Sequence, residues 1–373
     1  MPIEKIDSVN GKRLKFAREY YNIGLKEVAE KTKINEDNLR NFEEGTDFPT
    51  YSQLEKLSNY YNQSMLFFFF KSTPDSTKLQ ADFRSIEYNS KQILSRRIKE
   101  MIEQANLYQL NLYELNKMKN PPSFIKMLLE ESVSKEDLAS WLRIKIDLQI
   151  ENQINNFNSS ENLLDYIRQK FYDIGIYIFK DSFKEDSVSG LCVYDDYFPI
   201  IYINNKATFA RQLFTVFHEI YHIYLKQTSG YFERNEEKEC DTFASSFLIP
   251  ESHFKNIIKK YDNFEDETII NYLARTYCVS CDAIRYRLLS LRKISKEYYN
   301  SHHQTSIRNF TKNFSGGNFY YTKISYLGKP YLNTVFGKYS SGEIKISQVA
   351  MYAGIKTSNV SKLASNFSGG KSK

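Results

Sequence analysis

The chain has 373 residues, of which 41% are hydrophobic and 26% charged. This balance is typical of a folded, water-soluble protein and excludes a largely disordered chain and an integral membrane protein. The formal net charge of +6 is compatible with nucleic-acid contact but is too small to predict it. The length predicts more than one domain.

The N-terminal residues show no succession of basic, apolar and small residues, so we expect no signal peptide and a cytoplasmic location. The longest apolar run, Met65 to Phe70, is about a third of the length that spans a bilayer, and we expect it to form a buried helix end. The pair Cys278-Val-Ser-Cys281 has no second pair at zinc-ribbon spacing. The cysteines are therefore interpreted as buried or incidental thiols.

From Gly11 to about Phe70, apolar residues recur at helical spacing in short blocks separated by polar turns, which predicts four or five short helices. Within this region, Leu25 to Lys31 and Glu36 to Glu44 read as two helices joined by a turn. Asn35 is expected to cap the second helix. Three apolar residues are expected to pack between the helices: Ala29, Ile34 and Leu39.

A helical connector is predicted to follow. Gln92 to Lys119 contains no Pro or Gly and reads as one long helix, which Pro121-Pro122 ends. Lys135 to about Phe157 reads as a second helical stretch.

The pattern changes to strands near Ile174. Three segments read as strands: Ile174 to Phe179, Leu191 to Tyr194 and Pro199 to Asn204. An amphipathic helix is predicted from Ala207 to Lys226. The third strand precedes this helix and is expected to pair with an extended substrate through backbone hydrogen bonds.

This helix carries His218-Glu219-Ile220-Tyr221-His222. Residues four apart share a helix face, so the two imidazoles can reach one tetrahedral Zn²⁺ ion. Glu219 is rotated by about 100° from His218 and can accept a proton from a water molecule beside the metal. With five histidines in the chain, the pattern would arise by chance in roughly half a per cent of such chains. The motif predicts metal-dependent peptide hydrolysis.

A third metal ligand is expected from the acidic run that opens the next helix, Asn235 to Leu248. Glu237 and Asp241 fall on one face, so Glu237 is the predicted ligand and Asp241 is predicted to orient a ligand histidine. Glu239 lies about 200° around from Glu237 and is the weaker candidate. A solvated acidic cluster is the alternative for all three.

The region from about Ile174 to Leu289 resembles the ImmA/IrrE metallopeptidase family. The segments that carry the resemblance are Phe198-Pro199-Ile200-Ile201, Arg211 to His222, Glu237 to Ala244 and Leu248-Ile249-Pro250. The resemblance implies a reduced zincin-like fold, with zinc bound by His218, His222 and Glu237 and with Glu219 as general base. It also implies that the substrate is a helix-turn-helix repressor protein.

Tyr221 departs from the family, which commonly has a small residue at this position. This departure leaves open an alternative: a non-catalytic, DNA-binding transcription factor whose peptidase-like domain serves as a sensor or dimer scaffold. A third alternative is an antitoxin or phage-immunity protein that acts by binding only.

The N-terminal segment, Gly11 to Phe70, resembles Xre-type helix-turn-helix domains, most clearly at Val28 to Lys31 and Leu39 to Gly45. Ala81-Asp82-Phe83-Arg84 is similar to the sequence that joins such domains to ImmA/IrrE peptidases. The resemblance places three residues toward the bases: Glu36, Asp37 and Asn41. It places three others toward the phosphates: Lys26, Asn35 and Arg40. Because two of the base-facing residues are acidic, a module that binds a repressor or a second subunit is the alternative.

Near the C-terminus, Ile346 to Ile355 and Val360 to Leu363 faintly repeat a helix-turn-helix pattern. A helical oligomerisation or sensing tail would show the same pattern.

The sequence thus predicts a mostly α, α+β protein with four parts: a helix-turn-helix domain at 8–70, a helical connector at 71–165, a zinc metallopeptidase domain with a small sheet at 166–295, and a helical C-terminal module of unassigned role at 296–373. The expected partners are DNA and a repressor protein, with a homodimer as a further possibility and no membrane.

Overall fold

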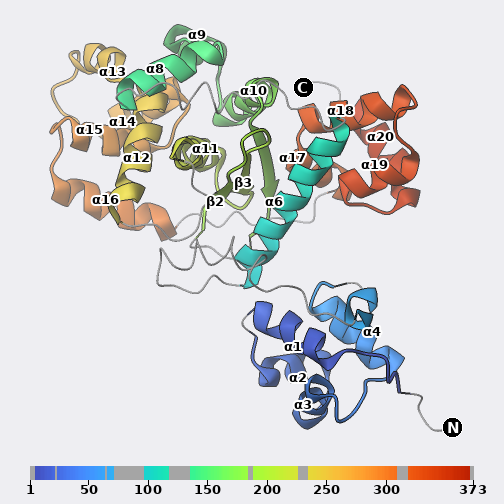
Figure 1. Cartoon of the computed structure of the whole chain (residues 1–373). Helices are drawn as coiled ribbons and strands as arrows, with labels where there is room; N and C mark the ends of the chain where they lie inside the picture. Colours follow the sequence, from blue (N-terminus) through green and yellow to red (C-terminus); the bar gives the residue numbers. More distant parts are fainter. Residues whose placement is uncertain are drawn as a thin grey trace. The chain divides into compact units, whose positions relative to one another are not determined.

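The computed structural model describes residues 5–21, 23–63, 65–70, 96–116, 135–183, 188–225, 234–308 and 318–369. These residues form helices and a three-stranded sheet, which confirms the predicted mostly α fold class (Figure 1). The chain divides into two compact units, Met1–Lys99 and Glu100–Lys373, and each is described by itself. No described helix has both the length and the apolar composition needed to cross a membrane.

Up to Phe70, the described residues of the first unit form four α-helices and a short 3-10 helix. They are α1 (Gly11–Tyr20), α2 (Leu25–Thr32), α3 (Glu36–Glu44), α4 (Tyr51–Tyr60) and η1 (Met65–Phe69). Lys33 adopts the left-handed conformation with φ of 60° and ends α2. The Asn35 side chain accepts a hydrogen bond of 2.8 Å from the Asp37 backbone N–H and caps α3, which confirms the predicted cap.

The core of this unit is formed by buried residues from α1, α2, α3, α4 and η1. Ile34 and Leu39 are buried as predicted, whereas Ala29 is only half-buried. The run from Met65 was predicted to be a buried helix end, and this prediction is only partly correct. Phe68 is fully buried, but Leu66 and Phe70 are 65% and 53% exposed because the tight 3-10 turn points them away from the core.

The helical connector differs in detail from its prediction. The long helix is α6 (Arg96–Leu115), and the flanking parts of the predicted span lie outside the described residues. The stretch predicted as one helix from Lys135 to Phe157 is two helices, α8 (Lys135–Lys145) and α9 (Ile150–Asn156). Asp147 between them has φ of 53°, a left-handed conformation that no helix interior contains, so the chain turns there.

The sheet contains β1 (Tyr177–Asp181), β2 (Gly190–Val193) and β3 (Ile200–Asn204), in the order β1-β3-β2. All three strands were predicted, although β1 begins later than expected because α10 (Ser160–Asp173) is closed by Ile174 and by Gly175, whose φ is 89°. β3 pairs in parallel with β1 and antiparallel with β2. The prediction that β3 pairs with substrate is therefore wrong, because both of its edges are already occupied.

The second unit is built around this sheet. Helix α11 (Phe209–Tyr224) packs on β2, β3 and α10, and α12 (Arg234–Leu248) packs on α11. At the centre, the rings of Phe217 and Phe247 stack with centroids 3.8 Å apart, and both side chains are fully buried. The chain continues through α13 (Glu251–Ile258), α14 (Glu267–Tyr277), α15 (Cys281–Ser290) and α16 (Lys296–Arg308).

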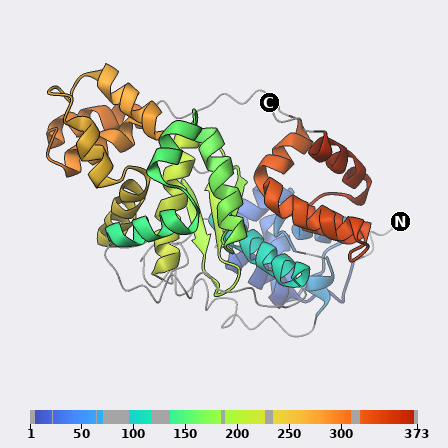
Figure 2. The same cartoon turned by 90° about the horizontal axis from the view of Figure 1, so that it is seen from above.

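The C-terminal module contains α17 (Phe319–Leu327), α18 (Lys329–Ser340), α19 (Ile346–Ala353), the 3-10 turn η2 (Thr357–Asn359) and α20 (Val360–Ser368). Helix α17 packs on β1 and α18 packs on α10. Figures 1 and 2 show these helices on one side of the sheet and α12 to α16 on the other. The sheet therefore carries the metal motif on one side and the C-terminal module on the other.

Candidate metal centre

Helix α11 holds the two histidines on one face. Its N-terminus is capped by Thr208, whose side chain accepts from the Arg211 backbone N–H. Leu213, Val216 and Ile220 are fully buried and fix the rotation of the helix against the sheet. This rotation leaves the side chain of His222 1% exposed and that of His218 15% exposed.

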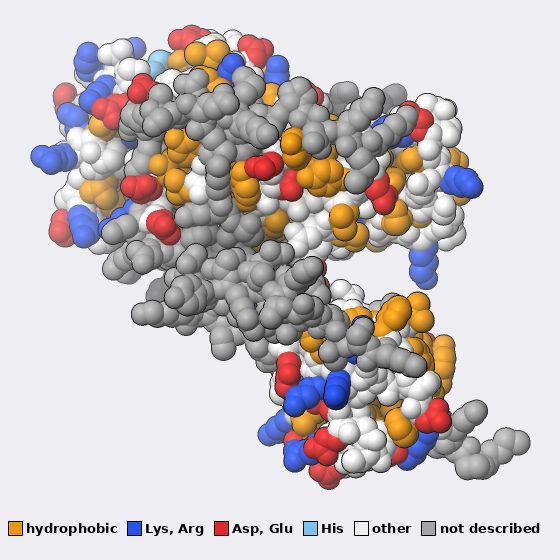
Figure 3. Space-filling view, in the orientation of Figure 1, with side chains coloured by type: hydrophobic (Ala, Val, Ile, Leu, Met, Phe, Trp, Pro, Cys, Tyr) orange, Lys and Arg blue, Asp and Glu red, His pale blue; other side chains and the backbone are white. Residues whose placement is uncertain are grey.

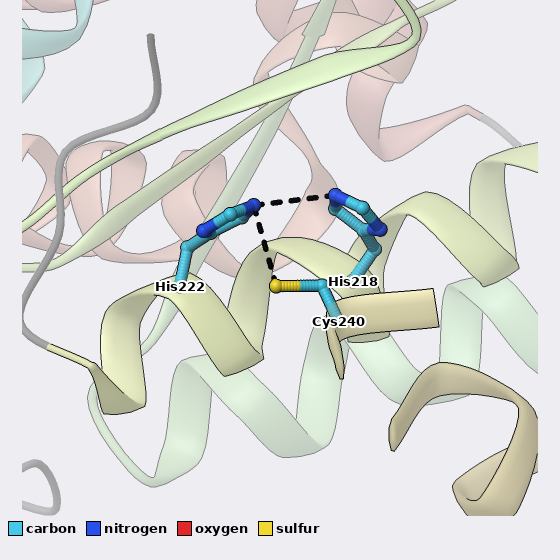
Figure 4. A group of neighbouring side chains, drawn as sticks. All are labelled: His218, His222 and Cys240. Carbon is cyan, nitrogen blue, oxygen red and sulfur yellow. Dashed lines mark hydrogen bonds between the residues drawn. The ribbon is translucent and has the colours of Figure 1, made fainter. Parts of the chain in front are cut away.

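The two imidazoles point toward one another. The Nε2 atoms of His218 and His222 are 3.2 Å apart (Figure 4). Two ring nitrogens at this distance are close enough to bind one metal ion. The one-turn spacing in the sequence therefore places two donor atoms together, as the helix geometry requires.

Helix α12 adds two carboxylates to this pair. Glu237 Oε2 lies 3.2 Å from the Nε2 atom of His218, and its Oε1 lies 3.6 Å from the Nε2 atom of His222. On the other side of the His218 ring, Asp241 Oδ1 is 2.9 Å from Nδ1. Glu237 thus faces both ring nitrogens that could bind metal, while Asp241 holds the nitrogen that would not.

These separations match a tetrahedral zinc site. Zinc lies about 2.0–2.1 Å from nitrogen and carboxylate oxygen ligands, which puts two such ligands about 3.3 Å apart at the corners of a tetrahedron. The observed His218–His222 separation is 3.2 Å, and the Glu237 separations are 3.2 and 3.6 Å. The donor set therefore has both the chemistry and the spacing that zinc takes.

Cys240 also enters this cluster, which sequence reasoning did not foresee because its thiol was interpreted as buried or incidental. Its Sγ atom lies 3.4 Å from His222 Nε2, and one donor atom each from His218, His222 and Cys240 fall within 4.8 Å of one another. Cys240 follows Glu237 by three residues, so the two share a face of α12. This three-residue spacing was the sequence feature that could have indicated a thiol beside Glu237.

The centre thus offers two overlapping sets of three donors, one completed by Glu237 and the other by Cys240. Burial raises the pKa of the Cys240 thiol, and the carboxylates of Glu237 and Glu219 raise it further. Glu237 contacts both histidines, whereas the hydrogen bond of Cys240 is to His222. Glu237 is the better third donor on both grounds.

The electrostatics couple His218 to its carboxylates. Burial lowers the pKa of His218, but hydrogen bonds to Asp241 and Glu237 outweigh it and raise the pKa to about 10. Burial raises the pKa of Glu237, and its contacts with His218 and His222 reverse this effect and lower it to about 2. In the metal-free protein the cluster is therefore an imidazolium held by carboxylates, and a metal ion must displace that proton.

Two family models match parts of the chain. Residues 172–289 match the family model of the IrrE N-terminal-like domain, a group of M78 peptidases, and residues 11–65 match that of a helix-turn-helix domain. The chain joins a helix-turn-helix domain to an IrrE-like domain. Searches of the curated proteins and of the solved structures gave no match. The His218 cluster lies entirely within the IrrE-like domain.

Glu219 lies beside the cluster, on the side of the IrrE-like domain where β2 crosses α11. It is 5% exposed. At Gly190, the first residue of β2, a Cβ atom would stand 2.4 Å from Thr215 Cγ2 and 3.5 Å from Glu219 Oε1. Only glycine therefore lets this strand pass so close to the helix. In the strand order β1-β3-β2, β2 lies at the end of the described sheet that is nearer to Glu219.

Two other residues of the IrrE-like domain lie apart from the donor set. Tyr221 is 5% exposed, and its ring stacks on that of Phe243 with centroids 5.1 Å apart. The bulky ring therefore packs into the core and away from the donors. The Nδ1 atom of His253 lies 2.8 Å from the Tyr277 hydroxyl oxygen.

The N-terminal domain places its predicted DNA-contacting residues on and near α3. Lys26, Asp37 and Arg40 are exposed, whereas Glu36 and Asn41 are half-buried. Arg40 lies 3.4 Å from the Glu36 carboxylate, and the Asn35 side chain is engaged in capping α3. The segment Ala81 to Arg84 lies outside the described residues.

Proposed function

We propose that this protein is a zinc-dependent endopeptidase and transcriptional regulator that cleaves or controls a helix-turn-helix repressor. The observation that carries the proposal is the convergence of Glu237 on the Nε2 atoms of His218 and His222, at the separations of zinc ligands. The match of residues 172–289 to a peptidase family supports it. The repressor as substrate, and a cytoplasmic location, are supported by the sequence resemblance.

In this proposal each residue of the centre has one role. His218, His222 and Glu237 hold the ion, which when bound polarises the scissile carbonyl and lowers the pKa of a water molecule. Glu219 is the general base that accepts the proton of that water and then delivers it to the leaving amine. Asp241 accepts a hydrogen bond from His218 Nδ1–H and so directs the Nε2 lone pair toward the ion.

The peptide would lie along β2. An extended segment can add to an edge strand through backbone hydrogen bonds, which favours a stretched substrate and requires few side-chain contacts. The close passage of Gly190 over α11 brings that strand edge near Glu219. A substrate on β2 would therefore present its backbone to the general base.

We propose further that the N-terminal domain binds DNA, with Lys26, Asn35 and Arg40 toward phosphates and Glu36, Asp37 and Asn41 toward bases. The match to a helix-turn-helix family supports this assignment. The acidic first turn of α3, Glu36 and Asp37, favours contact with cytosine amino groups over phosphates. Binding of a repressor or formation of a homodimer through this domain is the alternative.

One observation favours a second candidate function, a non-catalytic regulator with a structural zinc. Cys240 Sγ lies 3.4 Å from His222 Nε2, and the corners of a tetrahedron with Zn–N of about 2.1 Å and Zn–S of about 2.3 Å are about 3.6 Å apart. A fourth protein ligand would close the site to water, because catalytic zinc sites keep one position open.

The test is the metal content of the purified full-length protein beside two variants, followed by incubation with a repressor encoded next to its gene. The enzyme proposal expects one zinc in the wild type and in Glu219→Gln, little in His218→Ala, and cleavage by the wild type alone. Zinc that is retained without any cleavage of the repressor supports the second candidate. A wild type that takes up no zinc contradicts both.

A further inference from the structure

We propose that the C-terminal module, α17 to α20, is a second DNA-binding unit in which α20 enters the major groove of duplex DNA. The N-terminal domain is the helix-turn-helix recognised by family comparison, and the proposed peptidase function says nothing of the C-terminal module. The proposal does not depend on that activity. It rests on the geometry of α19 and α20, on their surface residues and on the charge of the module.

The segment α19-η2-α20 aligns with the pair α2 and α3, with the 3-10 turn η2 at the positions of the first three residues of α3. Helices α2 and α19 both have eight residues, and each ends at a left-handed residue, Lys33 with φ of 60° and Gly354 with φ of 60°. An apolar residue follows each turn, Ile34 and Ile355. Each residue of the first motif is separated from its counterpart in the second by the same number of residues along the chain. The two motifs therefore align without insertion or deletion.

The buried positions of the second helices also correspond. Leu39 and Phe42 are the buried residues of α3, and Val360 and Leu363 occupy the same two positions and are 2% and 0% exposed. In a helix-turn-helix these residues hold the second helix against the first and decide which face remains exposed. The exposed face of α20 is therefore the one that α3 would present to a groove.

The exposed residues differ in a direction that favours nucleic acid. Glu36 and Asp37 of α3 align with Thr357 and Ser358, and both of the latter are exposed. Two further exchanges each place an exposed lysine in the C-terminal motif: Asn35 aligns with Lys356, and Asn41 aligns with Lys362. Two carboxylates that phosphates repel are thus replaced by hydroxyls, and two amides are replaced by lysine ammonium groups. Hydroxyls and ammonium groups can donate to phosphates and to base edges.

The exposed face of α20 contains no large apolar group. Ser361, Lys362 and Ser365 are exposed on it and are small or cationic, so the helix backbone can approach a groove closely. An oligomerisation helix would instead present an apolar stripe. The surface of α20 therefore suits a groove of DNA. The exposed large apolar residues of the module lie on the other helices: Phe319, Tyr321, Tyr339, Ile346 and Met351.

The module also concentrates positive charge. Residues 318–369 contain six lysines and a single acidic residue, Glu343, which lies 3.2 Å from Lys338. Lys345, Lys356 and Lys362 are exposed on or beside the two helices of the motif. Figure 3 shows lysine side chains extending from the outer edge of this part of the molecule. A mildly basic chain thus carries a strongly basic module, which is the charge pattern of a nucleic-acid-binding unit.

The module is fixed to the IrrE-like domain. The buried Arg168 of α10 donates to the carbonyl oxygens of Ser325 and Tyr326, at 2.8 and 3.1 Å. The hydroxyls of Tyr172 and Thr334 are 2.6 Å apart. DNA bound at α20 would therefore hold the metal centre in a set position relative to the duplex.

The proposal is tested with the full-length protein and a random-sequence DNA duplex, by fluorescence anisotropy at several salt concentrations. The background protein carries Lys26→Ala and Arg40→Ala, so that the N-terminal domain contributes little binding. A test variant adds Lys356→Ala and Lys362→Ala. A matched control instead adds Lys260→Ala and Lys296→Ala, which remove two exposed lysines outside the C-terminal module, one after α13 and one from the first turn of α16.

We expect the test variant to bind between about tenfold and a hundredfold more weakly near ~0.1 M salt, with a salt slope smaller by about two, because two phosphate contacts are lost. The control is expected to bind like the background. An unchanged affinity in the test variant, an equal loss in the control, or no binding by the background would each overturn the proposal. Zinc content, measured on the same samples, reports separately on the metal centre.

Discussion

Replacement of Asp241 by alanine should weaken metal binding although this residue touches no metal. Asp241 Oδ1 lies 2.9 Å from His218 Nδ1, where it fixes the ring orientation and increases the basicity of Nε2. Loss of such a partner typically lowers metal affinity by about 10- to 100-fold, or about 1.4–2.8 kcal/mol. We expect a loss of this size in Asp241→Ala.

The size of this loss should depend on pH, and the direction follows from His218. Its pKa of about 10 in the metal-free protein means that a proton competes with zinc at neutral pH. Removing Asp241 lowers that pKa and weakens the competing proton, which offsets part of the loss. The measured loss should therefore be smaller near about pH 7 than near about pH 10, where about half of the wild-type protein has lost the His218 proton and competition is weak.

The assay is a competition titration of zinc between the protein and a coloured chelator at both pH values. Glu239→Ala is the matched control, because it removes an exposed carboxylate from the same helix. If Asp241→Ala and Glu239→Ala bind zinc equally well at the higher pH, then Asp241 exerts only a general electrostatic effect and the reasoning is wrong.

Three further predictions concern stability, each measured by thermal or denaturant unfolding. The metal-free protein should lose stability as pH rises from about 6.5 to about 10, because the raised pKa of His218 stabilises the fold below the pKa of the unfolded chain and this contribution is lost through the folded pKa. The contribution has an upper bound of about 5 kcal/mol, which solvent screening at Glu237, 41% exposed, reduces. A His218→Asn variant with the same pH profile of stability would refute this prediction. Phe217→Ala should cost about 3–5 kcal/mol, because it empties a fully buried position stacked on Phe247, and a loss below about 1 kcal/mol would contradict the packing described. Gly190→Ala should cost about 1–3 kcal/mol, because the new Cβ would meet Thr215 Cγ2 at 2.4 Å; wild-type stability in that variant would show that the strand does not pass so close to α11.

Much of the fold followed from local patterns. The spacing of apolar residues placed α11, and the motif Asn35 followed by Glu36 placed the start of α3, because caps and helix periods depend on neighbouring residues. The break at Asp147 was missed, because a left-handed conformation of a non-glycine residue depends on tertiary packing that the sequence does not show.

The strand order was also beyond local reasoning. Strand β3 directly precedes α11, which suggested an edge role for it, but β2 returns antiparallel on its free side and takes that role. Which strand lies at an edge is decided by long-range pairing. The positions of the strands in the sequence could be predicted, but the order in which they pair in the sheet could not.

At the metal centre, helix periodicity brought together the residues that share a face. His218 and His222 on α11, and Glu237 and Asp241 on α12, lie as their spacing suggested. The approach of Cys240 to His222 depends on how α12 packs against α11, and so it emerged only in three dimensions. The C-terminal motif was visible in the sequence, but its alignment with α2 and α3 required the observed turns at Lys33 and Gly354.

The most direct test of the central claim is X-ray absorption spectroscopy at the zinc edge of the zinc-loaded wild-type protein. An open catalytic centre held by His218, His222 and Glu237 predicts a shell of nitrogen and oxygen at about 2.0–2.1 Å and no sulfur. A sulfur neighbour at about 2.3 Å that disappears in Cys240→Ser would show that Cys240 binds the zinc. That result would contradict the donor set of His218, His222 and Glu237 on which the peptidase account rests.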